Sequence, residues 1–249
     1  MLYDAAYFRS GESSEHGEGY GDYLAEEDLH RLNARRRLRL LEGLVPTGAI
    51  LDVGCAAGFF LDEARRRGWD VSGSELSPEM ASWAGDELGL DGIVQGPFSE
   101  QGWERGSFDV VTMWDYIEHT LDPTAELSRA VELLRPGGIL VLSTGDAGSL
   151  LARLSGRRWH LLTPRHHNYF FTRKALLLAL DEAGLTTLLS RYLSARYSVR
   201  YLVHKLRTLS DPQALRRLER RLNRSRLGAT SVPVNLGDII TVVGRAEAP

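Results

Sequence analysis

The stretch ILDVGCAAGFFLDEA, residues 50–64, decides the fold of this chain. Its first four residues are apolar apart from Asp52, which is typical of a strand that is covered on both faces. The small residues from Gly54 to Gly58 predict a tight turn, and the apolar residues after them predict a helix. The stretch therefore predicts a strand, a turn and a helix.

The turn between Gly54 and Gly58 has the composition of a ligand-binding turn. A turn that opens a helix offers N–H groups and a positive dipole end to a ligand. The G-x-x-x-G spacing differs from the dinucleotide fingerprint, and no Lys-Ser/Thr follows as in a phosphate-binding loop. Asp52 needs partners, because burying a lone carboxylate is expensive. An ordinary structural turn is the alternative.

The motif DVGCAAGFF resembles the first motif, D/E-x-G-x-G/A-x-G, of class I S-adenosylmethionine (SAM) dependent methyltransferases. Ala56 stands where that family often has glycine. Glu75, SFDVV (residues 107–111) and LLRPGG (residues 133–138) agree with the family in order and spacing. The chain is similar to small-molecule methyltransferases of the ubiquinone-biosynthesis and sugar type.

Predicted strands and helices alternate from residue 50 to residue 185, which indicates a doubly wound α/β sheet. The resemblance implies a Rossmann-like sheet of seven strands in the order 3-2-1-4-5-7-6, with strand 7 antiparallel. We predict one domain over residues 1–249. It comprises an N-terminal arm or lid (1–45), a core (46–190), a basic helical cap (191–230) and a last strand (231–249), with IITVV paired at the sheet edge.

The resemblance implies SAM as cofactor and S-adenosylhomocysteine as its product. Glu75, 17 residues beyond Gly58, is expected to accept both ribose hydroxyls, although it could instead cap the next helix. A tyrosine of the arm would bind the cofactor's carboxylate, and adenine would stack on Phe98 or Leu76. The predicted cofactor contacts are Tyr20, Asp52, Gly54, Cys55, Ala56, Gly58, Phe59, Glu75, Leu76, Gln95, Gly96, Phe98, Trp114 and Asp115.

Acid and base candidates follow the fourth predicted strand in WDYIEH, residues 114–119. Residues at the carboxyl ends of parallel strands face the ligand crevice. A hydroxyl acceptor gains from a base whose pKa is near neutral, which favours histidine. We therefore predict His119, then His166, as the base, with Asp115 beside them. Glu118 is expected to be a structural acid that orients the loop.

Residues 157–171, RRWHLLTPRHHNYFF, contain His160, His166 and His167. They lack an H-x-x-x-H pair on a helix, and neither a cysteine nor a nearby carboxylate completes a set, so we expect no metal. The resemblance implies a W…P-x-H-x-H-Y-F pattern here. His166 matches its first histidine, and Asn168 replaces the second, which argues against a two-histidine site.

Positive charge is concentrated in residues 191–226, which contain eleven Lys and Arg residues and only two acids. This segment therefore has a charge of +9, and the rest of the chain has a charge of −12. Two amphipathic helices broken at Asp211-Pro212 are expected there. Their basic faces could be solvated, or could bind an anionic substrate such as a nucleotide-linked sugar, or an anionic membrane surface. The net charge of −3 gives no nucleic-acid signal for the whole chain.

These observations predict an enzyme that moves a methyl group from SAM to a small, possibly anionic molecule, with a hydroxyl favoured as acceptor. Methylation of nitrogen or carbon, and a SAM-binding protein without methyl transfer, are the alternatives. No signal peptide and no apolar run of bilayer length are visible. We therefore expect a cytoplasmic monomer or homodimer without a nucleic-acid partner or a membrane span.

Overall fold

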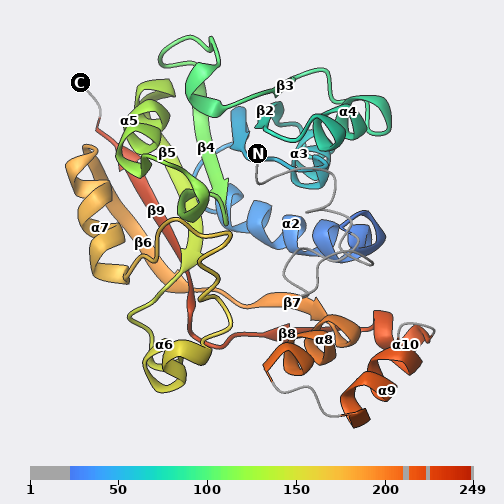
Figure 1. Ribbon diagram of the computed structural model, residues 1–249. Helices are drawn as coiled ribbons and strands as arrows, with labels where there is room; N and C mark the ends of the chain where they lie inside the picture. The colour runs from blue at the N-terminus through green and yellow to red at the C-terminus, as the bar shows by residue number, and fades with distance from the viewer. Residues whose placement is uncertain (1–22, 210–212, 223–224, 248–249) are drawn as a thin grey trace.

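A computed structural model describes residues 23–209, 213–222 and 225–247 (Figure 1). Residues 1–22 of the predicted arm, Tyr20 among them, and the break at Asp211-Pro212 lie outside the described residues. The described part contains nine α-helices, four 3-10 turns and nine strands.

The core is a seven-stranded sheet in the order β3-β2-β1-β4-β5-β9-β6, in which β9 runs antiparallel to both of its neighbours. This confirms the predicted order, with β9 as the seventh strand. The expected place of that strand at the sheet edge is wrong, because β9 lies between β5 and β6. The strands are β1 (Ala49–Val53), β2 (Asp70–Glu75), β3 (Ile93–Gln95), β4 (Phe108–Trp114), β5 (Leu134–Gly145), β6 (Leu185–Tyr192) and β9 (Ile239–Ala246).

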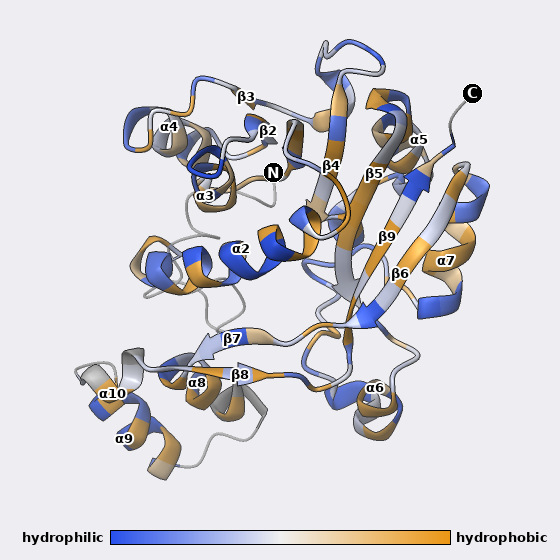
Figure 2. Ribbon diagram, turned by 180° about the vertical axis from the view of Figure 1, so that it is seen from behind, coloured by the Kyte–Doolittle hydropathy of each residue, from blue (hydrophilic) through white to orange (hydrophobic). Residues whose placement is uncertain are grey.

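Helices cover both faces of this sheet (Figures 1 and 2). Leu51 and Val53 belong to one cluster with residues of α5 and α7, whereas Ile50 belongs to another with residues of α2 and α3. Successive side chains of a strand point to opposite faces, so burial on both faces requires the apolar runs seen in the sequence. The helices are α2 (Glu27–Glu42), α3 (Phe59–Arg65), α4 (Pro78–Asp86), α5 (Pro123–Leu133) and α7 (Arg173–Glu182), with the 3-10 turns η1 (Leu24–Glu26), η2 (Phe98–Glu100) and η3 (Ile117–His119).

Side-chain caps set the helix starts. The Ser77 hydroxyl accepts from the Met80 N–H at the start of α4, and the Asp122 carboxylate accepts from the Ala125 N–H at the start of α5. Proline follows each cap at the first helical position, where its missing N–H costs nothing. A Ser or Asp cap followed by proline is a local sequence signal for a helix start.

A second, two-stranded sheet was not predicted. The strands β7 (Ala195–Ser198) and β8 (Ser231–Val234) pair antiparallel, so the predicted last strand is two strands in two sheets. This β7–β8 ribbon is fixed to α2, since the Asn33 side chain accepts from the Arg196 N–H at 2.8 Å and donates to the Arg196 carbonyl at 2.9 Å. The remaining helices are α6 (Leu150–Ser155), η4 (Gly156–Arg158), α8 (Val199–Leu209), α9 (Gln213–Leu222) and α10 (Arg226–Ala229).

Candidate active site

The turn between β1 and α3 requires small residues. Gly54, Ala56 and Gly58 all have positive φ, at 72°, 48° and 77°, a region that disfavours side chains. A Cβ on Gly54 would lie 2.7 Å from the Tyr116 ring, which covers the turn. A larger residue at position 54 would therefore clash with the protein itself.

The N–H groups of this turn hold β2 in place. Gly54 and Cys55 both donate to the Ser74 carbonyl, at 2.9 and 3.0 Å, and Ala56 donates to the Glu75 carboxylate at 2.8 Å. The N–H groups of Gly54, Cys55 and Ala56 are therefore bonded to β2 and are not available to a ligand in this structure. The Cys55 thiol is buried against Gly73, and burial raises its pKa, so it contributes packing.

Two buried acids lie at the ends of β1 and β2. Glu75 accepts from the N–H groups of Ala56 and Ser77, and Asp52 accepts from the Thr112 hydroxyl at 2.6 Å. Burial raises the pKa of Glu75 and raises the pKa of Asp52 to about 7. Ser77 is the N-cap residue of α4, so the bond from its N–H gives Glu75 a structural contact at the start of that helix as well. A ligand with hydroxyl donors and positive charge would stabilise both carboxylates.

The residues predicted around adenine separate into two groups. Leu76, Gln95 and Gly96 lie together at the ends of β2 and β3, since the Gln95 amide donates to the Leu76 carbonyl and Gly96 donates to Glu75. Phe98 is only 2% exposed and packs in the core near Trp103. Stacking of adenine on Phe98 is therefore not supported, because the core already covers that ring.

Arg37, which sequence reasoning missed, reaches the end of β4 from α2. Its guanidinium lies 4.3 Å from the centroid of the Trp114 ring and 3.2 Å from the Asp115 carboxylate. Asp115 has a positive φ of 52° and also accepts from the Ser143 hydroxyl at 2.9 Å. Arg37 is thus a cation held at the carboxyl edge of the sheet, where it can meet a ligand's carboxylate.

An aromatic stack closes the other side of the turn. Tyr23 lies over His30 with ring centroids 3.9 Å apart and over Phe59 at 5.8 Å, so the predicted contact Phe59 lies beneath a tyrosine. Burial raises the pKa of Tyr23, and Arg37 and Asp52 are among the charges that act on it. Burial also lowers the pKa of His30 to about 4. Within the described part of the arm, Tyr23 is therefore a tyrosine that lies at this site.

His119 lies on η3, just beyond β4. Its Nδ1 is 2.8 Å from the His166 carbonyl, so a neutral His119 that donates from Nδ1 presents Nε2 as an acceptor. Burial lowers the pKa of His119. The His167 ring lies 4.8 Å from the His119 ring, whereas His166 meets His119 through its backbone carbonyl. The structure thus pairs His119 with a histidine that was not a predicted base.

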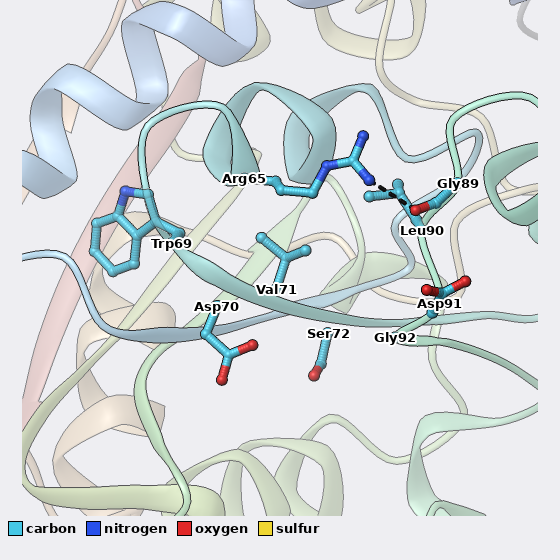
Figure 3. A pocket seen from close by; sticks show the side chains of 9 residues that line it. All are labelled: Arg65, Trp69, Asp70, Val71, Ser72, Gly89, Leu90, Asp91 and Gly92. Carbon is cyan, nitrogen blue, oxygen red and sulfur yellow. Dashed lines mark hydrogen bonds between the residues drawn. The ribbon is translucent and has the colours of Figure 1, made fainter.

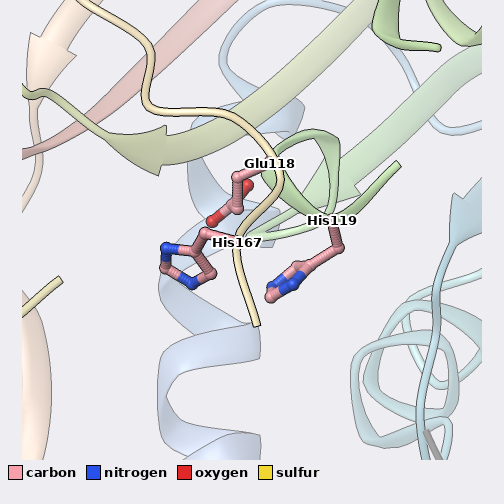
Figure 4. A group of neighbouring side chains, drawn as sticks. All are labelled: Glu118, His119 and His167. Atoms are coloured by element: carbon pink, nitrogen blue, oxygen red, sulfur yellow. The ribbon is translucent and has the colours of Figure 1, made fainter. Parts of the chain in front are cut away.

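Glu118, His119 and His167 surround one small space (Figure 4), with one potential ligand atom from each within 4.8 Å of the others. Burial, followed by the charge of Asp115, raises the pKa of Glu118 to about 8. The statement that no carboxylate completes a histidine set is wrong, because Glu118 comes from η3 and not from the histidine loop. These side-chain types could hold a divalent cation. The absence of a metal stays a prediction.

A cavity of about 480 Å³ lies elsewhere, at the amino end of β2 (Figure 3). The Arg65 guanidinium at its rim donates to the backbone carbonyls of Gly89 and Leu88. Asp70, at its wall, begins β2, whereas Glu75 ends it. The cavity is therefore at the opposite edge of the sheet from the candidate site.

A sheet of this order, with acids ending β1 and β2 beside a glycine turn, defines the class of SAM-dependent methyltransferases. Residues 25–190 match the family described as a methyltransferase domain, and the chain belongs to this family. It therefore catalyses SAM-dependent methyl transfer to a small molecule. Among the helices of the described residues, none has the length and apolar composition needed to cross a bilayer.

Curated relatives agree with this assignment, and solved structures share the fold. The chain is 36% identical over 172 residues to a ubiquinone biosynthesis O-methyltransferase of Xanthomonas axonopodis pv. citri, covering 64% of this chain and 72% of that protein. A SAM-dependent methyltransferase from Archaeoglobus fulgidus has a TM-score of 0.60 at 18% identity, covering 90% and 98% of the two chains. A geranyl diphosphate C-methyltransferase from Streptomyces coelicolor has a TM-score of 0.54 at 16% identity, covering 96% and 85%. These structures show the shared fold.

The residues of the site fit SAM. The cofactor carries ribose hydroxyls and positive charge, which suit the buried carboxylates of Glu75 and Asp52, and it carries a carboxylate, which suits Arg37. When bound, SAM supplies a methyl group that is already activated on its sulfonium. Positioning and exclusion of water can then supply much of the catalysis.

Proposed function

We propose that this methyltransferase methylates a hydroxyl group of a small molecule. The observation that carries the proposal is His119, whose Nδ1 is directed at the His166 carbonyl and whose Nε2 is therefore the basic nitrogen. A hydroxyl acceptor must lose a proton as its oxygen takes the methyl group. His119 stands at the carboxyl end of β4, where acceptors are expected to bind.

Burial supports this role for His119. A lowered pKa keeps the imidazole neutral at neutral pH, so it is ready to accept a proton. Asp115 and Arg37 form an ion pair at the same strand end, which gives the site a fixed pair of opposite charges. We assign Glu75 to the ribose hydroxyls, and we assign Arg37 and Tyr23 to the methionine end of the cofactor.

The relatives also support oxygen as the acceptor atom, since the curated proteins at 36% identity are named O-methyltransferases. Their acceptors are not transferred to this chain. The loop that carries His166 and His167 contacts η3, because the N–H groups of Asn168 and Tyr169 both donate to the Glu118 carbonyl. We therefore assign this loop to the acceptor side of the site.

The proposal is tested by incubating the protein with methyl-labelled SAM and matched pairs of acceptors, each pair differing only in a hydroxyl or an amine. Mass spectrometry would locate the label. We expect methylated hydroxyl products whose formation requires His119. Label found on amines alone, at a rate that His119→Asn leaves unchanged, would reject the proposal in favour of nitrogen methylation.

A further inference from the structure

A short helix beyond the carboxyl end of β5 presents leucines to the outside. In α6, Leu150 is 72% exposed and Leu154 is 78% exposed. Residues four apart lie on the same side of a helix, so these two side chains form one apolar surface. Ala152, between them in sequence, is buried and fixes the opposite side of α6 to the protein.

The protein holds these leucines outward. The Ser149 hydroxyl accepts from the Ala152 N–H and caps α6. After η4, the buried Trp159 donates its indole N–H to the Asp238 carboxylate at 2.9 Å. Both ends of the segment are thus anchored, and the two leucines cannot turn inward without breaking these contacts.

Arginines surround the apolar surface. Arg153, Arg157 and Arg158 are exposed, and within the described part of the chain none of the three forms an ion pair. Residues 149–158, SLLARLSGRR, contain no acid and no aromatic residue. The segment therefore combines two exposed leucines with three positive charges and no compensating negative charge.

The same end of the molecule carries further positive charge. Figures 1 and 2 place α6 and the helices α8–α10 at one end, beyond the carboxyl ends of β4 and β5. On α9, Arg217, Arg220 and Arg221 are exposed, while the one acid of the helix, Glu219, bonds to His204 of α8 at 2.8 Å. The outward charge of α9 is thus positive.

We propose that this end of the protein docks on the surface of an anionic phospholipid bilayer, with Leu150 and Leu154 entering the headgroup region. Charge complementarity identifies a bilayer as the partner of this surface. The arginines can bind the phosphate headgroups, while the exposed leucines beside them reach toward the acyl chains. A single-stranded nucleic acid would instead need aromatic side chains on which its bases stack, and residues 149–158 have none. The docking is peripheral.

The test uses the full chain and sedimentation with vesicles of phosphatidylcholine, with and without phosphatidylglycerol. We expect binding to the anionic vesicles alone, weakened by salt. The variants Leu150→Ser/Leu154→Ser and Arg157→Gln/Arg158→Gln should each reduce the partition coefficient by about tenfold or more. Leu178→Ser on α7 and Arg105→Gln are matched controls, because both positions are exposed elsewhere and should leave binding unchanged.

Three outcomes would overturn the proposal: no binding of the unaltered protein to anionic vesicles, full binding by the leucine variant, or equal losses in the controls. A change of oligomeric state in the leucine variant without lipid would assign the surface to a second copy of the chain. The measurement needs neither SAM nor an acceptor, so its result is independent of the proposed hydroxyl methylation.

Discussion

His119 makes the chemistry testable at the scale of one residue. Its pKa is lowered by burial, so the imidazole becomes protonated on the acid side of neutral pH, and kcat should fall there. We predict that His119→Asn lowers kcat by about 10²–10⁴-fold, the usual contribution of a general base, and removes the acid limb of the pH–rate profile. His166→Asn tests the other predicted base, and His204→Asn is the control, because His204 lies on α8 and bonds to Glu219. Near-full kcat in His119→Asn would show that histidine is not the base.

Glu75 should determine cofactor affinity. We predict that Glu75→Ala weakens SAM binding by about 2–3 kcal/mol, because it removes charge-assisted hydrogen bonds. Isothermal titration calorimetry measures this directly, and Glu87→Ala, an exposed acid after α4, is the control. Unchanged affinity in Glu75→Ala would reject its assignment to the ribose.

The pKa of Asp52 predicts that the affinity for SAM depends on pH. Its pKa of about 7 in the free protein means that it is largely protonated below pH 7 and charged above it. A cationic ligand binds the charged form better, so SAM affinity should rise as the pH passes upward through 7. Asp52→Asn should flatten this dependence. Calorimetry at pH 6 and pH 8 compares the two proteins, and a steep dependence retained in the variant would contradict the prediction.

At the scale of elements, the Asn33 side chain joins the β7–β8 ribbon to α2. Asn33→Ala removes two hydrogen bonds to the Arg196 backbone, so it should lower the free energy of unfolding by about 1–2 kcal/mol. Urea denaturation measures the change, with Arg39→Ala, on an exposed part of α2, as the control. Equal stability of the two variants would mean that the ribbon is held by other contacts.

The elements could be predicted where the local sequence determines them. Glycine turns, Ser/Asp caps followed by proline, and buried apolar runs fixed the strands β1–β5 and the helices between them. The ribbon could not be predicted, because four-residue strands such as Ala195–Ser198 have too few residues for a periodic pattern. Its pairing depends on contacts between segments far apart in sequence.

The residues of the candidate site could likewise be predicted from the sequence only in part. Asp52, Glu75 and His119 lie near the ends of strands, so the predicted strand order was sufficient to bring them to the same edge of the sheet. Arg37 lies 78 residues from Asp115, and its contact depends on how α2 crosses the sheet. Likewise, only the folded loop decides that the His167 ring packs against the His119 ring.

At the scale of the whole molecule, the place of β9 constrains the order of assembly. The strand β6 joins the sheet through β9, and β9 is the later of the two in the chain. During synthesis, β5 and β6 leave the ribosome before the strand that joins them. Val242 and Val243 of β9 are fully buried in the finished sheet. Before β9 is synthesised, the apolar side chains that pack against these two valines are exposed. The nascent chain therefore carries two unpaired strand edges until β9 emerges, and this interval is when it most needs protection from aggregation.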